Sequence, residues 1–174
     1  MVRLVLKAQR GDEASFVKLM EQNKQGMYKV AKSYLHHEED AADAMQETIL
    51  TCFEKLDTLK EPQYFKTWMI RILINKCKDI LQKNRELCLI EEMPETESHD
   101  MAQENFEFME LLHSIEEKYR TILILYYVEG FKIREIAELL DMNEHTVKTR
   151  LVRARKKFAR ECQDTGIYAG GQLI

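Results

Sequence analysis

Apolar residues recur at steps of three and four over most of this chain, which is the spacing of one face of an α-helix. Such runs predict helices at residues 15–35, 40–56, 64–84, 119–129, 132–140 and 144–162. The 174 residues include only two prolines and six glycines, and three of those glycines fall in the last nine positions. Because so few residues favour turns, we expect an all-α fold built mostly from long helices.

Composition divides these helices into two small domains. The first three helices can bury one another's apolar stripes, which predicts a first domain at residues 1–88. The next segment contains Pro94, many acids and no periodic pattern, so residues 89–105 are predicted as an acidic linker. A second helical domain is predicted at residues 106–162, followed by a tail at residues 163–174.

The charged residues are segregated along the chain. The formal net charge of −4, taken alone, argues against a nucleic-acid partner. Yet residues 86–117 hold eleven acids and no Lys or Arg, whereas residues 148–160 hold seven basic residues and no acid. Residues 60–85 form a second basic block, with seven basic residues against two acids. Each basic block fits a phosphate-binding surface or a solvated helix face, and charge alone favours the solvated face.

Residues 131–151 follow a helix-turn-helix pattern. The first helix of the pattern carries an inward-facing apolar set, Ile133, Ile136, Ala137 and Leu140. The small side chain of Ala137 would let the second helix approach closely after the short turn at residues 141–143. Asn143 can cap the second helix, and Glu144 in its first turn complements the helix dipole. The pattern predicts a DNA-binding domain.

The second helix of this pattern has two contrasting faces. Its inward positions recur at steps of four, three and four, namely Val147, Leu151, Ala154 and Phe158. Its opposite face is basic, as in helices that enter the major groove of DNA. Lys148, Thr149 and Arg153 are candidates for bases or nearby phosphates, whereas Arg150, Arg155, Lys156 and Lys157 are candidates for phosphates. The full set of candidate duplex-binding residues is His145, Thr146, Lys148, Thr149, Arg150, Val152, Arg153, Lys156 and Lys157. A helical hairpin with a solvated basic face is the alternative.

Three stretches of the chain resemble segments of the extracytoplasmic-function sigma factors of bacterial RNA polymerase. Residues 40–56 (DAADAMQETILTCFEKL) are similar to the family's polymerase-binding helix, and residues 64–76 (YFKTWMIRILINK) to its promoter-melting segment. Residues 146–157 (TVKTRLVRARKK) are similar to the helix that reads the minus-thirty-five promoter element. The stretches occur in the family's order and spacing, and the resemblance covers about residues 10–162. It implies a factor that binds core RNA polymerase, directs promoter-specific initiation and catalyses nothing itself.

The resemblance also implies three binding surfaces. Core polymerase would contact a polar ridge beside an apolar stripe, formed by Asp40, Asp43, Gln46 and Glu47. Melted minus-ten DNA would contact aromatic and cationic side chains, which suit unstacked bases and phosphates, namely Tyr64, Phe65, Lys66, Trp68, Arg71, Asn75 and Lys76. On spacing alone, a solvated face explains the ridge better, and core positions explain Phe65 and Trp68 better. Residues 60–64 (KEPQY) differ from the Gly-rich loop common in the family. Members are commonly restrained by a membrane-anchored anti-sigma factor, so such a partner is expected.

Other functional classes fit the sequence less well. A stand-alone helix-turn-helix regulator with a helical sensor domain would leave the acidic ridge and the aromatic-basic helix without a purpose. An enzyme would need converging catalytic groups, yet there is no Gly-rich phosphate loop, and the acids and histidines at residues 36–40 point in different directions on a helix. The four cysteines have neither zinc nor disulfide spacing, and no apolar run suits a signal peptide or a membrane span. We expect no metal, cofactor or small-molecule substrate, and a cytoplasmic location.

Overall fold

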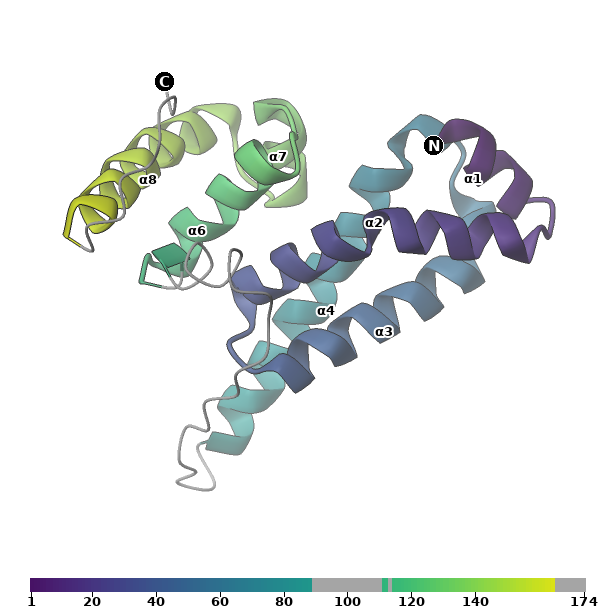
Figure 1. Ribbon diagram of the computed structural model, residues 1–174, viewed down its shortest axis with the longest axis horizontal. Coiled ribbons are helices and arrows are strands. Elements are labelled where there is room, and N and C mark those ends of the chain that lie inside the picture. Colours follow the sequence, from purple (N-terminus) through teal and green to yellow (C-terminus); the bar gives the residue numbers. More distant parts are fainter. Residues whose placement is uncertain (89–110, 113, 165–174) are drawn as a thin grey trace. The chain divides into compact units, whose positions relative to one another are not determined.

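The computed structural model describes residues 1–88, 111–112 and 114–164. The chain divides into two compact units, Met1–Ser98 and His99–Ile174 (Figure 1). Every regular element within the described ranges is helical, which confirms the predicted all-α fold. The predicted linker at residues 89–105 lies outside the described residues, as does the predicted tail beyond residue 164.

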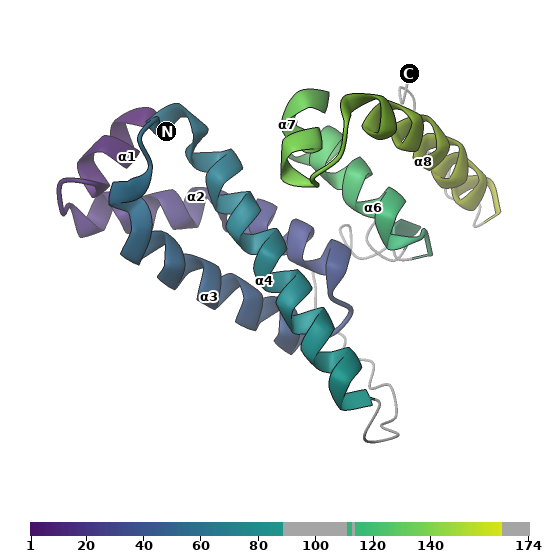
Figure 2. The ribbon, with the colours of Figure 1, turned by 180° about the vertical axis from the view of Figure 1, so that it is seen from behind.

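The first unit is built around three long helices, α2 (Glu13–Tyr34), α3 (Glu38–Lys55) and α4 (Phe65–Cys88), and each packs against the other two (Figure 2). They correspond to the first three predicted helices. Their largest fully buried side chains are Leu19, Met27, Leu35, Phe65, Met69, Ile70, Leu73 and Ile74. Burying a large apolar side chain contributes about 1.5–3 kcal/mol, so this shared core holds the three helices together.

A short helix that the periodicity did not predict precedes them. Helix α1 (Val2–Ala8) packs against α2 and buries Val5 completely. Gly11, with a φ of +89°, turns the chain into α2, whose first turn is capped by Asp12. Ser15 donates to Asp12 from its hydroxyl at 2.9 Å and from its backbone N–H at 3.1 Å, and these bonds lower the pKa of the Asp12 carboxyl. Seven residues are too few for a recognisable apolar stripe, so this helix depends on its contact with α2.

The buried face of α3 differs from the predicted one. Its buried residues are Ala41, Ala44, Met45, Thr48 and Cys52. Apolar spacing over residues 40–56 predicts one inward face that comprises Ala42, Met45, Ile49, Cys52, Phe53 and Leu56. The prediction was wrong for two of these residues, since Ala42 is exposed and Phe53 is 55 % exposed. Thr48 can occupy a core position because its hydroxyl donates to the Ala44 carbonyl at 2.7 Å, which satisfies the only polar group of its side chain. The true stripe therefore contains a threonine that a count of apolar residues passes over.

Two short 3-10 turns connect α3 to α4. The first, η1 (Leu56–Thr58), continues from the end of α3, and the second, η2 (Pro62–Tyr64), leads directly into α4. The side chains of Leu56 and Leu59 are buried beneath this connection, whereas Lys60 and Glu61 are exposed. The predicted loop before the third helix therefore has a buried beginning and an exposed tip.

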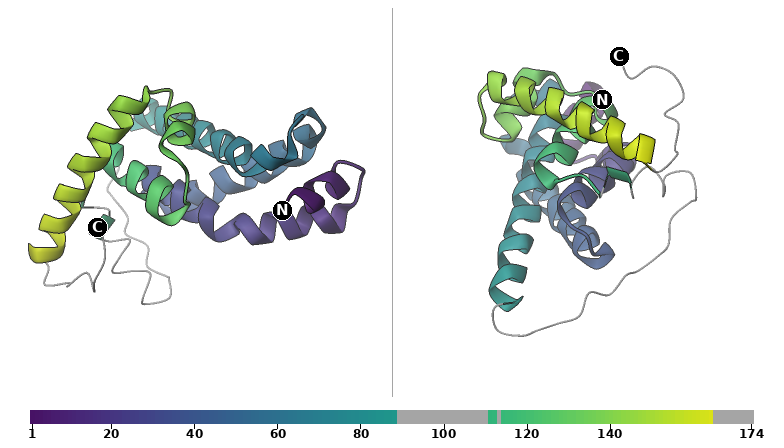
Figure 3. Two further views of the ribbon diagram at one scale, coloured as in Figure 1. Left: turned by 90° about the horizontal axis from the view of Figure 1, so that it is seen from above. Right: turned by 90° about the vertical axis from the view of Figure 1, so that its left-hand side faces the viewer.

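The second unit contains α6 (Glu117–Leu123), the π-helical turn η3 (Ile124–Val128), α7 (Ile133–Leu139) and α8 (Glu144–Asp164). Helix α8 is the longest of them and packs against both α6 and α7 (Figure 3). The prediction of one helix at residues 119–129 is only partly right, because the last turn widens and the Glu129 N–H donates to the Ile124 carbonyl at 2.9 Å. Gly130, with a φ of +70°, follows this helix and ends it.

A tight turn joins α7 to α8. Asp141 adopts a φ of +52°, and the N–H of Met142 donates to the Ala137 carbonyl at 2.9 Å, which closes the end of α7. The side chain of Asn143 accepts a hydrogen bond from the Thr146 N–H at 2.7 Å, which confirms the predicted cap of α8. Both ends of the turn are thus fixed by local hydrogen bonds.

Replacing Asp141 by glycine is expected to stabilise the second unit by about 0.5–1 kcal/mol, because an L-residue is strained at positive φ and glycine is not. The converse control is Gly130→Ala, which introduces a Cβ at a φ of +70° and should destabilise the same unit by about 1 kcal/mol. Amide hydrogen exchange of α7 and α8 in the full chain measures both effects. Faster exchange in the Asp141→Gly protein would contradict the expectation.

Candidate nucleic-acid interface

Helix α8 presents one buried face and one exposed face, as predicted. Val147, Leu151, Ala154 and Phe158 are all buried. On α7, Ile136 and Ala137 are buried, but Ile133 and Leu140 are only half-buried, and Leu139 takes a core position instead. The predicted approach of α8 to the small side chain at Ala137 agrees with the packing of these two helices.

The exposed face of α8 carries most of the candidate duplex-binding residues. The exposed members are His145, Lys148, Val152, Arg153, Lys156 and Lys157, and the half-buried ones are Thr146, Thr149 and Arg150. The Thr149 hydroxyl donates to the His145 carbonyl at 3.0 Å, so its polar atom is already engaged with the helix backbone. An exposed row of cations follows a capped turn, which is the geometry of a helix that inserts its first turns into the major groove.

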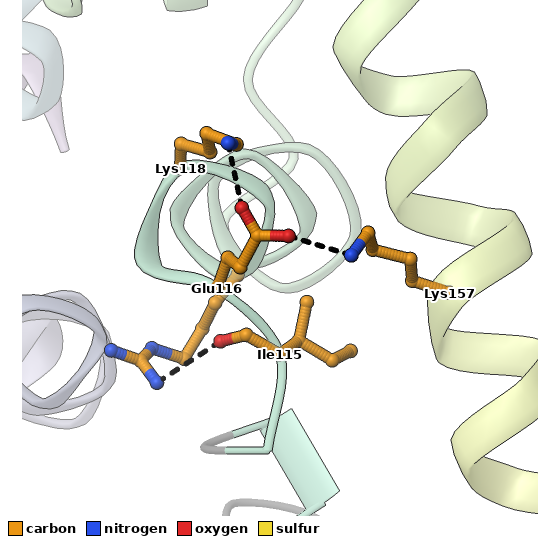
Figure 4. Close-up of polar contacts among 5 residues, drawn as sticks. Ile115, Glu116, Lys118 and Lys157 are labelled. Carbon is orange, nitrogen blue, oxygen red and sulfur yellow. Dashed lines mark hydrogen bonds and ion pairs between the residues drawn. The ribbon is translucent and has the colours of Figure 1, made fainter.

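Lys157 forms an ion pair within the second unit. Its ammonium lies 2.6 Å from a carboxylate oxygen of Glu116 (Figure 4). The same ammonium lies 5.3 Å from the ring centroid of Tyr119. The other Glu116 oxygen lies 2.6 Å from the ammonium of Lys118. Hydrogen bonds from Lys118 and Lys157 lower the pKa of Glu116 to about 2, so this carboxylate stays charged at neutral pH. Exposed Lys156 is therefore a better candidate for a phosphate contact than Lys157.

Two further arginines of this unit also have internal roles. The guanidinium of Arg155 lies 5.5 Å from the ring centroid of Tyr127, within range of a cation–π interaction. Arg120 is buried, and one of its terminal nitrogens donates to the Ile115 carbonyl at 3.3 Å. Both arginines contact other groups of the second unit, and neither contact was predicted from the sequence.

The start of α4 separates the aromatic candidates of the first unit. Tyr64 is 54 % exposed, whereas Phe65 is fully buried. This burial favours the core position that helical spacing indicated for Phe65, because a base could reach its ring only if the start of α4 opened. Trp68 is half-buried, and its ring centroid lies 6.1 Å from that of Phe65. Among these three aromatic candidates, Tyr64 is the most available for stacking on a base.

The polar candidates along α4 lie nearer the surface. Arg71 and Asn75 are exposed, and Lys66 and Lys76 are half-buried. The ammonium of Lys76 lies 2.8 Å from a carboxylate oxygen of Glu47 on α3. This hydrogen bond with Glu47 raises the pKa of Lys76. One candidate DNA-binding residue is therefore paired with one candidate polymerase-binding residue.

The polar ridge of α3 is largely exposed. Asp43, Gln46 and Glu47 are all exposed, whereas Asp40 is half-buried and accepts a hydrogen bond from the Asn84 side chain at 2.9 Å. Asp40 therefore serves to join α3 to α4. Leu50 is 57 % exposed and lies three residues after Glu47, so it extends the same helix face. Leu50 was not among the residues predicted from the sequence, although an apolar residue on the same helix face as a polar ridge is a usable signal.

Sites for other chemistry are not apparent in the described residues. No group of three or more His, Cys, Asp or Glu in the described ranges is placed to hold a metal ion. Cys52, Cys77 and Cys162 are buried, and burial raises the pKa of the Cys52 thiol to about 12, so this thiol is protonated at neutral pH. Among the described helices, none combines the length and the apolar character needed to cross a membrane.

Comparison with known proteins gives matches over most of the chain. Residues 19–86 match the family model "Sigma-70 region 2", and residues 105–158 match "Sigma-70, region 4". The RNA polymerase sigma factor SigV of Bacillus subtilis is 30 % identical over 154 residues, which cover 87 % of this chain and 93 % of SigV. The ECF RNA polymerase sigma factor SigW of the same organism is 25 % identical over 178 residues, which cover 92 % and 95 %.

Solved structures share the helical fold. CnrH, in a structure with the cytosolic domain of CnrY, has a TM-score of 0.69 and 23 % identity over 94 % of this chain and 97 % of CnrH. The sigma factor RpoE of Bartonella quintana, in a structure with the anti-sigma factor NepR, has a TM-score of 0.72 and 19 % identity over 85 % and 96 %. At these identities the two structures support the all-α arrangement alone.

Proposed function

Because the chain belongs to the extracytoplasmic-function family of RNA polymerase sigma factors, we propose that it directs core polymerase to promoters of an envelope-stress or extracellular-signal response. Members of this family bind core RNA polymerase, confer promoter specificity and are not enzymes. The observation that carries the function is the match of both sigma regions, in order, across this one chain. We infer the envelope-stress or extracellular-signal response from membership in the extracytoplasmic-function family.

The two units divide the work in this proposal. The exposed ridge of Asp43, Gln46 and Glu47, extended by Leu50, contacts core polymerase. The exposed tip around Tyr64 and the cations of α4 contact the melted minus-ten strand. The exposed face of α8, in which Lys148 and Arg153 are the exposed Lys and Arg residues nearest the capped turn, reads the minus-thirty-five duplex. Exposure of these side chains supports the assignment, as does their charge.

An anti-sigma factor is the partner that we propose for restraint, and we propose that it is membrane-anchored. Two proteins of similar fold were solved with a bound partner: the sigma factor RpoE with the anti-sigma factor NepR, and CnrH with the cytosolic domain of CnrY. The exposed apolar side chains Leu50 and Phe53, beside the acids of α3, offer this chain a comparable docking surface. Since core polymerase and promoter DNA are cytoplasmic, we place the protein in the cytoplasm.

Run-off transcription with purified core polymerase tests the function. Adding the full chain should yield transcripts from a small subset of candidate promoters, whereas core polymerase alone should yield none of them. Gel-shift measurements without polymerase separate the competing class, because a stand-alone helix-turn-helix regulator shifts its duplex site unaided. An unaided shift together with unchanged run-off products would overturn the proposal.

Alanine substitutions of Arg153 and Lys156 are expected to have different effects on promoter binding by the holoenzyme. Arg153→Ala should cost about 1–3 kcal/mol of promoter binding and relax preference at one minus-thirty-five position. Lys156→Ala should weaken binding evenly across promoter sequences and reduce the slope of log K against log salt by about one. Lys24→Ala, at an exposed position of α2, is the matched control and should change neither quantity. A uniform loss in both α8 variants would refute the division between base and phosphate contacts.

A further inference from the structure

Gln9 joins α1 to the connection between α3 and α4. Its side-chain amide nitrogen donates to the Leu56 carbonyl at 2.9 Å and to the Leu59 carbonyl at 2.8 Å. These carbonyls lie 47 and 50 residues further along the chain. Gln9 itself is half-buried at the end of α1, and the side chains of Leu56 and Leu59 are buried. One amide group thus satisfies two backbone acceptors just before the exposed tip of the connection.

Gln9 reinforces a turn that the backbone also closes by itself. The last carbonyls of a helix lack N–H partners within that helix, and here the chain leaves α3 through the 3-10 turn η1. Within that turn, the Leu59 N–H donates to the Leu56 carbonyl at 3.2 Å, so the two carbonyls bound by Gln9 bracket one closed turn. Gln9 therefore fixes the position at which the chain leaves the core toward Lys60.

The other end of the exposed tip is fixed by the core. Phe65 is fully buried at the first residue of α4, directly after exposed Tyr64. Helix α1 also packs against η2, so the same short helix supports the tip from both sides of residues 60–61. The segment 60–64 is consequently a short span between two anchors, one made by hydrogen bonds and one by apolar burial.

We propose that Gln9 is a positioning residue for residues 60–64, which it holds in the conformation that receives the unpaired minus-ten strand. The inference rests on the proposed function, in which that segment meets melted DNA. In this proposal Gln9 does not contact DNA, and it acts only through its hydrogen bonds to the Leu56 and Leu59 carbonyls. Helix α1 then has a role beyond packing, since it links the N-terminus of the chain to promoter opening.

The test uses full-chain protein assembled with core polymerase. Gln9→Met keeps the length of the side chain and removes both N–H donors, and Gln22→Met, at an exposed position of α2, is the matched control. The probe is a fluorescent single-stranded oligonucleotide carrying the minus-ten element of a promoter that the unaltered holoenzyme transcribes. We expect Gln9→Met to weaken oligonucleotide binding about tenfold, as for the loss of two neutral hydrogen bonds, and to speed amide exchange at residues 60–64. Affinity for core polymerase should stay unchanged, as should minus-thirty-five duplex recognition.

Several results would overturn this role. Unchanged oligonucleotide binding by Gln9→Met would contradict it. A loss of polymerase affinity as large as the loss of oligonucleotide affinity would also contradict it, because it would indicate general destabilisation. Gln9→Glu is the second variant, since its carboxylate has no N–H to donate and faces two carbonyl oxygens. A loss confined to Gln9→Glu, with Gln9→Met unaffected, would trace the effect to new negative charge near DNA. Failure of the unaltered holoenzyme to transcribe any promoter would instead count against the proposed function.

Discussion

Replacing Phe65 by alanine is expected to destabilise the first unit by about 3–5 kcal/mol, because a fully buried aromatic ring leaves a cavity that the three packed helices only partly close. This is a large part of the stability of a small domain. Denaturant unfolding monitored through Trp68, the single tryptophan, reports the change close to its source, since the two ring centroids lie 6.1 Å apart.

The neighbouring substitution Tyr64→Ala provides the control. Tyr64 is more than half exposed, so its removal should change the free energy of unfolding by less than about 0.5 kcal/mol. It should nevertheless weaken holoenzyme binding to a single-stranded minus-ten oligonucleotide by about 1–3 kcal/mol, the contribution of one stacked base. If Phe65→Ala left stability intact and Tyr64→Ala lowered it, the assignment of core and contact at the start of α4 would be reversed.

Reversing the charges of Asp43 and Glu47 together is expected to weaken the complex with core polymerase at least roughly tenfold. Both carboxylates are exposed, so an acidic ridge fits a basic partner surface, and lysines in their place would repel such a surface. Affinity should be measured by titrating core polymerase against labelled protein at two salt concentrations. The deficit should diminish at high salt, because exposed charges are screened. Circular dichroism should report unchanged helicity.

The ion pair between Glu47 and Lys76 requires its own control. Glu47→Lys also places two ammonium groups together across α3 and α4, where the two side chains now lie 2.8 Å apart. The combined change Glu47→Lys with Lys76→Glu restores an intramolecular pair of opposite charges. Polymerase binding should remain weak in this swapped protein if Glu47 faces the partner. Full recovery would mean that Glu47 acts only by pairing with Lys76, and the polymerase-binding ridge would lose that residue.

Features that depend on neighbouring residues in the chain were accessible from the sequence. The long helices follow from apolar spacing, and the cap at Asn143 and the stop at Gly130 follow from local backbone chemistry. The inward face of α8 was predicted correctly because four apolar side chains with no polar competitor define it. The resemblance of three separated stretches identified the family, since their order along the chain is itself a sequence property.

Tertiary packing alone decided which candidate side chains remain available to a partner. Phe65 and Tyr64 are adjacent in an aromatic-basic stretch, yet the packing of α4 buries the first and exposes the second. Lys157 belongs to the basic face by helical spacing, but Glu116, 41 residues earlier, engages its ammonium. Gln9 carries no signal in its own segment, because its acceptors lie 47 and 50 residues away. Helical periodicity sets the direction of a side chain about its own axis, whereas its partners depend on how separate helices pack, and that arrangement arises only when the chain folds.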